Sequence, residues 1–288
     1  MKKHLPELFI VCLMAFVSLT GILSMDFTKS SSYVNQYGDT VLLFGSGIYK
    51  ADSYFKAPIF IGTDIAVLLF LVPLLIAAIV KDTKTPDYKT KLRLASVEAV
   101  GLYYACSLCF GVKYNRIFVL YAALFALLLF MFIKRMRNCC SYRISYDIKK
   151  GDDVFLVFSG ISLCIAWLPD IIPTIITGRP LTLIENYTTE ATYILDLSII
   201  SPLCFIALFL LKMKDPLGTV IYSLLLQSII VVAVMMITQS AVQFLSGIDL
   251  PFAVLVTKSL IFVALGIVAV FLQKRLMLNV CAAENRCA

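Results

Sequence analysis

Eight long apolar stretches occupy most of this chain and restrict it to one class of fold. A membrane-spanning helix needs about 20 mostly apolar residues to cross a hydrocarbon core of roughly 30 Å. Of the 288 residues, 60% are hydrophobic and only 15% are charged, whereas soluble domains are nearer one quarter charged. The stretches are Leu8–Met25, Pro58–Val80, Leu92–Val112, Ile117–Ile133, Val154–Ile176, Tyr193–Leu211, Leu217–Gln239 and Phe252–Leu272. We predict an all-α polytopic membrane protein, a bundle of about eight transmembrane helices in one domain over residues 1–288. No internal repeat is evident.

The basic residues predict the orientation of the bundle. With the N-terminus in the cytoplasm, 18 of the 25 lysines and arginines fall on the inner side, 6 on the outer side, and Lys258 lies within a span. This bias follows the positive-inside rule. We therefore expect both termini to be cytoplasmic, with residues 26–57 forming an outer loop and residues 274–288 a cytoplasmic tail. The first span also resembles a signal sequence, but no good cleavage site follows it, so we expect it to be retained.

The first outer loop carries its own pattern of order. Branched and aromatic residues flank Gly45-Ser46-Gly47, which predicts a short hairpin or a strand–turn–helix packed on the outer surface. The run from Gly45 to Ser53, together with the run from Tyr114 to Phe125, resembles a group of uncharacterised bacterial multi-pass membrane proteins. That resemblance implies a bacterial inner-membrane location and no particular chemistry.

Four charged residues lie inside spans at a similar depth from the outer face. Asp64, Asp170, Asp196 and Lys258 all lie roughly 5–10 Å below the outer ends of their helices, at a rise of 1.5 Å per residue. A charge at the bilayer centre costs about 2.5–3.5 kcal/mol even on lenient scales, and such residues commonly mark functional sites. We expect an outward-facing polar pocket that binds or transports protons or a small cationic or zwitterionic solute. The alternative is an internal salt bridge that fixes helix packing.

Each of these charges has an expected role. Asp64 and Asp196 would accept the ligand or the proton, and Lys258 would neutralise one acid. Asp170 stands between Pro169 and Pro173, and prolines free backbone carbonyls in helices, as in the broken helices that line transporter sites. Asp170 is therefore expected at a helix break.

A second group of polar residues lies deeper in the spans. Glu98 is near the cytoplasmic end of its span, where it could pair with an arginine such as Arg93. Alternatively it ends a proton path that runs through Tyr103, Tyr104 and Gln227.

Two other functions remain open from the sequence. Cys106 and Cys109 form a C-x-x-C pair, as in membrane thiol-redox enzymes, but no second cysteine pair occurs in an outer loop. A non-catalytic accessory or scaffold subunit is the other alternative. Lys258 could also be a Schiff-base lysine for retinal, but retinal pockets are rich in aromatic residues and the chain has one tryptophan. An aspartyl protease is a further hypothesis, which the lack of a G-x-G-D motif disfavours.

The composition also excludes whole classes of function. The single histidine, His4, is placed by the sequence in the N-terminal tail, and this disfavours the usual imidazole-rich metal sites. We expect no metal, no cofactor and a non-enzymatic role. The lipid bilayer and a small solute are the expected partners. We do not expect nucleic acid to bind, because the net charge of +7 reflects the basic inner loops rather than a basic domain. The sequence does not identify a protein partner.

Overall fold

The chain forms a bundle of eight apolar helical spans, which confirms the predicted fold of a multi-pass membrane protein. The computed structural model describes residues 4–248 and 252–284, with the side chains of 143, 145, 182, 252–258 and 282–284 outside that description. The helices are α1 (Leu5–Ile22), α2 (Ala57–Ala66), η3 (Val67–Leu71), α3 (Val72–Lys84), α4 (Tyr88–Gly111), α5 (Phe118–Cys140), α6 (Lys150–Thr177), α7 (Ala191–Leu195), η5 (Asp196–Ile200), α8 (Ser201–Lys212), α9 (Pro216–Leu245) and α10 (Phe252–Asn279). The segments α2, η3 and α3 form one span, and α7, η5 and α8 form another.

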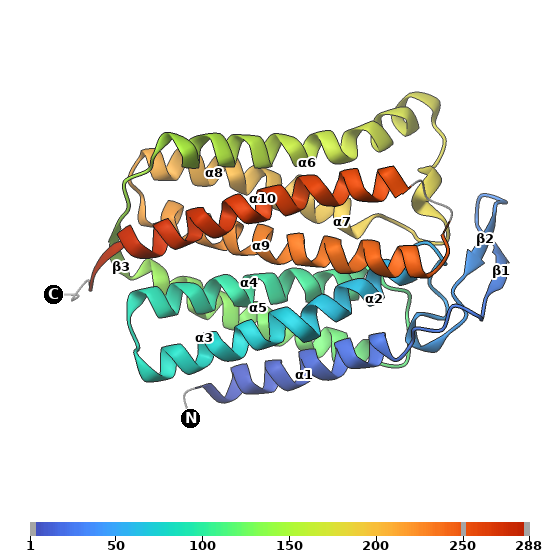
Figure 1. Cartoon of the computed structure of the whole chain (residues 1–288), viewed down its shortest axis with the longest axis horizontal. Coiled ribbons are helices and arrows are strands. Elements are labelled where there is room, and N and C mark those ends of the chain that lie inside the picture. The colour runs from blue at the N-terminus through green and yellow to red at the C-terminus, as the bar shows by residue number, and fades with distance from the viewer. Residues whose placement is uncertain (1–3, 249–251, 285–288) are drawn as a thin grey trace.

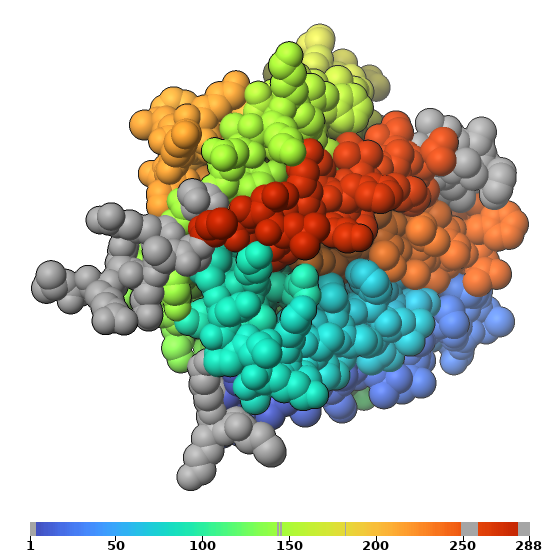
Figure 2. Space-filling view, turned by 60° about the vertical axis from the view of Figure 1, so that its left-hand side comes forward, coloured from blue at the N-terminus to red at the C-terminus, as the bar shows by residue number. Residues whose placement is uncertain are grey.

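The bundle has two distinct ends. At one, which we call the terminal end, α1 begins and α10 ends; the opposite one, the hairpin end, carries the strands β1 and β2 (Figure 1). The helices α4 and α9 run through the middle and are the most buried spans. Figure 2 shows α10 lying along the surface between α6 and the helices of the first half of the chain. Polar side chains on α4 and α9 therefore have the least access to lipid.

The loop after α1 is ordered, as predicted. Strands β1 (Ser31–Val34) and β2 (Thr40–Leu43) pair antiparallel, with Ser31 opposite Leu43. Gly45 has a φ of 77°, and a Cβ there would lie 3.1 Å from the backbone of Lys29. Only glycine adopts such a turn without strain. The turn leads into a short 3-10 helix, Gly47–Tyr49, which delivers the side chain of Tyr49 into the bundle.

A second small sheet lies at the terminal end. Strand β3 (Tyr142–Ser145) follows α5, and it pairs antiparallel with β4 (Cys281–Glu284), which follows α10. This pairing could not be predicted from the sequence, because four-residue strands separated by about half the chain leave no periodic pattern.

The first and second halves of the chain place the same features in the same order. Each half has a π-helical turn in its second span, followed two residues later by a proline: Leu71 precedes Pro73, and Ile200 precedes Pro202. The third span of each half begins at an aspartate that caps the helix, Asp87 in one and Asp215 in the other. The first span of each begins with a buried acid that pairs with an arginine near the end of the fourth span. These ion pairs are Glu7–Arg135 and Asp152–Arg275.

Candidate functional site

Asp64 is fully buried and accepts hydrogen bonds on both carboxylate oxygens. The hydroxyl of Tyr49 donates to Oδ2 at 2.6 Å, and the hydroxyl of Tyr104 donates to Oδ1 at 2.6 Å. Gly21 of α1 lies against the carboxylate, since a Cβ at Gly21 would stand only 1.7 Å from Oδ2. Among the described residues, no lysine or arginine pairs with Asp64. Two neutral hydroxyls therefore supply its hydrogen bonds.

Asp196 is held in the same way from the second half of the chain. Its Oδ1 accepts from the hydroxyl of Tyr103 at 2.9 Å, and its Oδ2 accepts from Nε1 of Trp167 at 3.0 Å. Only 8% of the residue is exposed. Tyr103 and Tyr104 are neighbours on α4, so this one helix contacts an aspartate from each half.

Both aspartates lie beside π-helical turns. Asp64 precedes the turn Val67–Leu71, and Asp196 begins the turn Asp196–Ile200. Pro73 and Pro202 explain the turns, because a proline cannot donate to the carbonyl four residues before it and its ring clashes with that carbonyl. Such wide turns are frequent at functional sites.

Asp170 differs from the other two. The helix α6 runs unbroken through Pro169 and Pro173, so the expected helix break at Asp170 is wrong. Membrane-spanning helices tolerate prolines because small local adjustments satisfy the freed backbone groups. Asp170 is half-buried, and its Oδ2 accepts from the hydroxyl of Tyr193 at 2.9 Å. The ring of Tyr193 stacks on Trp167 with a centroid distance of 4.4 Å. Asp170 thus connects to Asp196 through a stacked aromatic pair, without a direct hydrogen bond.

The expected counter-charge, Lys258, lies in α10, but its side chain falls outside the described residues. Its pairing with an aspartate stays a prediction. Gln227 is buried on α9.

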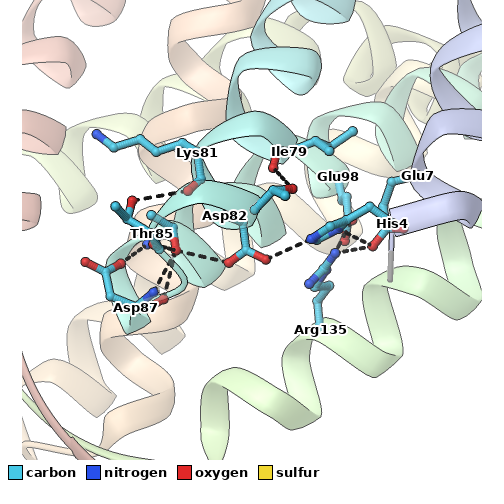
Figure 3. Close-up of polar contacts among 11 residues, drawn as sticks. His4, Glu7, Ile79, Lys81, Asp82, Thr85, Asp87, Glu98 and Arg135 are labelled. Atoms are coloured by element: carbon cyan, nitrogen blue, oxygen red, sulfur yellow. Dashed lines mark hydrogen bonds and ion pairs between the residues drawn. The ribbon is translucent and has the colours of Figure 1, made fainter. Parts of the chain in front are cut away.

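A second buried polar cluster lies at the terminal end, where the sequence placed a tail. His4, only 2% exposed, lies 3.3 Å from Oε1 of Glu7 and 3.2 Å from Oδ2 of Asp82 (Figure 3). The placement of His4 in a tail is therefore wrong, because the ring packs against α1 and α3. Glu98 pairs with Arg135 at 3.2 Å rather than with Arg93, and Arg135 also pairs with Glu7.

The loops at the hairpin end are joined by polar contacts that sequence reasoning missed. Asp52 is fully buried, and its Oδ1 accepts from the backbone N–H of Lys113 and from the hydroxyl of Tyr187, each at 2.9 Å. Lys56 pairs with Glu190 and lies 4.1 Å from the centroid of the Tyr187 ring. Burial raises the pKa of Asp52 to about 7, against the lowering effect of its two donors. These contacts fasten residues 185–190 to the loops of the first half.

Cys106 and Cys109 are half-exposed free thiols on α4. Within residues 4–248 and 252–284, no three His, Cys, Asp or Glu side chains are grouped so that they could hold a metal ion.

Comparison with protein-family models, curated proteins and solved structures finds no match to this chain. The resemblance to bacterial membrane proteins therefore stays a prediction.

Proposed function

We propose that this membrane protein is a transporter that exchanges protons, or a small cationic or zwitterionic solute, at Asp64 and Asp196. The observation that carries the proposal is the pair Tyr103–Tyr104, which holds two carboxylates from opposite halves of the chain without a described cation. A carboxylate removed from water requires a proton or a cation to become neutral. The adjacent π-helical turns supply backbone that can change its hydrogen bonding.

The arrangement of the loops supports a particular conformation for this transporter. Tyr49 reaches Asp64 from the loop at the hairpin end, and Asp64 has no exposed surface. Entry of a solute from that end requires Tyr49 to leave the carboxylate. We therefore assign this structure to a state closed at the hairpin end, the end that the positive-inside rule predicts to face outside the cell.

The test is proton flux into proteoliposomes that contain a pH-sensitive dye, driven by a potassium gradient with valinomycin. Asp64→Asn and Asp196→Asn should each reduce the initial rate about tenfold or more, because the amide keeps the volume but cannot exchange a proton at that site. Asp26→Asn is the matched control, since Asp26 lies in the loop at the hairpin end and its described partners are Thr28 and Lys29. The same vesicles are then tested with gradients of ammonium, choline and basic amino acids.

Equal rates for wild type, Asp64→Asn and Asp196→Asn, in proteins that elute as folded monodisperse particles, would overturn the proposal. A loss of flux in Asp26→Asn as large as in the other two would also count against it, since the effect would then not belong to the buried carboxylates.

A further inference from the structure

A cavity of about 330 Å³ opens among the loops at the hairpin end. Its volume lies at the lower end of the range of roughly 300–1,000 Å³ that small-molecule sites occupy. It lies outside the spans, between strand β2, the segment before α2, residue 185 and the residues that follow α9. The lining residues are Leu42, Tyr54, Phe55, Glu185, Gly247 and Ile248.

The described lining combines apolar and aromatic surface with a carboxylate. Leu42, Phe55 and Ile248 are apolar, Tyr54 adds a second aromatic ring, and Glu185 supplies the carboxylate. Among the described residues, no lysine or arginine belongs to this lining. Aromatic faces and a carboxylate both attract an ammonium group, and an apolar wall favours a hydrocarbon body.

The side chain of Tyr54 is held in place by its surroundings. The hydroxyl of Tyr54 lies 3.2 Å from the carbonyl of Phe27 and 3.0 Å from that of Ser246. The ring of Tyr54 also packs against Phe44, with a centroid distance of 5.8 Å. A rigid wall loses little freedom on binding, which favours affinity.

Glu185 stands in a strained backbone conformation. Its φ is 50° and its ψ is −112°, and outside glycine only Lys214 shares a positive φ within the described residues. Such strained conformations occur often at ligand clamps. The side chain of Asn35 donates to the carbonyl of Glu185 at 2.8 Å and holds this conformation.

The carboxylate of Glu185 has one described hydrogen-bond partner, the hydroxyl of Ser53, which donates to Oε2. Burial raises the pKa of Glu185, while Ser53 and Lys56 act in the opposite direction. The carboxylate is therefore oriented by a neutral donor, and Lys56 itself pairs with Glu190.

We propose that this cavity binds a small organic cation, an ammonium group carried on an apolar body, with Glu185 as its counter-ion and Tyr54 and Phe55 as its aromatic wall. The site is separate from Asp64 and Asp196, and it does not depend on whether the protein transports a solute.

The experiment measures binding of benzyltrimethylammonium to the full chain in lipid nanodiscs by calorimetry, with empty nanodiscs subtracted. Benzyl alcohol and benzoate are the neutral and anionic comparators. Wild type should bind the cation at least about tenfold more tightly than either comparator, because each of them loses the ion pair with Glu185.

Glu185→Gln should weaken binding of the cation about tenfold or more, and Phe55→Leu should also weaken it. Asp26→Asn is the control, since it removes one negative charge from the loops at the hairpin end outside the cavity lining and leaves the Lys56–Glu190 ion pair intact. Its affinity should stay within about threefold of wild type. Binding of benzoate equal to that of the cation would overturn the proposal. So would unchanged affinity in Glu185→Gln and Phe55→Leu proteins that elute as folded particles.

Discussion

Tyr103 and Tyr104 are consecutive residues of α4, and they donate to carboxylates from opposite halves of the chain. Tyr103 contacts Asp196 at 2.9 Å, and Tyr104 contacts Asp64 at 2.6 Å. Consecutive residues of a helix point about 100° apart, which lets one helix serve two sites. The two aspartates therefore contact the same helix through different donors, and the described residues show no hydrogen bond shared between them.

These separate hydrogen bonds predict which tyrosine substitutions have additive effects on the free energy of unfolding. Tyr104→Phe and Tyr103→Phe should each lower the free energy of unfolding by about 1–3 kcal/mol, because each leaves a buried carboxylate oxygen without its donor. The losses should add in Tyr103→Phe/Tyr104→Phe, since the acceptors differ, and should not add in Tyr49→Phe/Tyr104→Phe, which share Asp64. Denaturant unfolding in detergent measures all of these.

Tyr114→Phe is the control for that series, because Tyr114 is 79% exposed and its change should stay within about 0.5 kcal/mol. Strong non-additivity between Tyr103 and Tyr104 would show that Asp64 and Asp196 form one site.

Gly21 is expected to tolerate no side chain. A Cβ there would lie 1.7 Å from Oδ2 of Asp64, so Gly21→Ala should destabilise the protein by about 2 kcal/mol or more. At Gly111 the nearest atom to an added Cβ is 3.6 Å away, and Gly111→Ala should be nearly neutral. Thermal unfolding compares the two, and the cost of Gly21→Ala should shrink in an Asp64→Ala background.

Asp52 should make stability depend on pH. Its pKa is about 7 in the folded protein because of burial, against 3.8 for the ordinary group. The folded state then holds a proton that the unfolded state has lost between pH 4 and 7, so stability falls as pH rises through this window, by up to roughly 4 kcal/mol. Asp52→Asn should flatten the profile, as measured by urea unfolding at several pH values.

Asp26→Asn is the control for the pH series. The hydrogen bond from Thr28 lowers the pKa of Asp26 to about 2, so this carboxylate is ionised in both states across the window. If the stability of Asp52→Asn falls with pH as steeply as that of wild type, Asp52 is not the cause of the pH dependence.

Arg135 should contribute strongly to the stability of the terminal end. Arg135→Gln leaves Glu7 and Glu98 without their described cation and should cost about 3–5 kcal/mol. Arg137→Gln, an exposed change on the same helix, should cost less than about 0.5 kcal/mol. Urea unfolding distinguishes the two, and equal effects would mean that the cluster contributes no specific stability.

The assignment of the terminal end to the cytoplasm can be tested with Cys140 and Cys281, which are both exposed there. In single-cysteine proteins, a membrane-impermeant maleimide should label these residues in inverted vesicles and leave them unlabelled in intact cells. The reverse pattern would reverse the orientation.

The membrane class, the eight spans and the order in the first loop could all be predicted from the sequence. These features follow from the length of the apolar stretches and from turn residues such as Gly45, which act locally. Asp64, Asp170 and Asp196 also stand out in the sequence, because a charged residue inside an apolar stretch is visible without knowledge of its contacts.

The contacts of these charged residues became known only from the packed structure. The hydroxyls of Tyr49, Tyr103 and Tyr104 reach their acceptors through packing between helices distant in the chain, and no local pattern encodes such a meeting. The same holds for His4, which looks like part of a polar tail until α3 brings Asp82 beside it. Span length and charge are properties of a segment, whereas a hydrogen-bond partner is a property of the packed bundle.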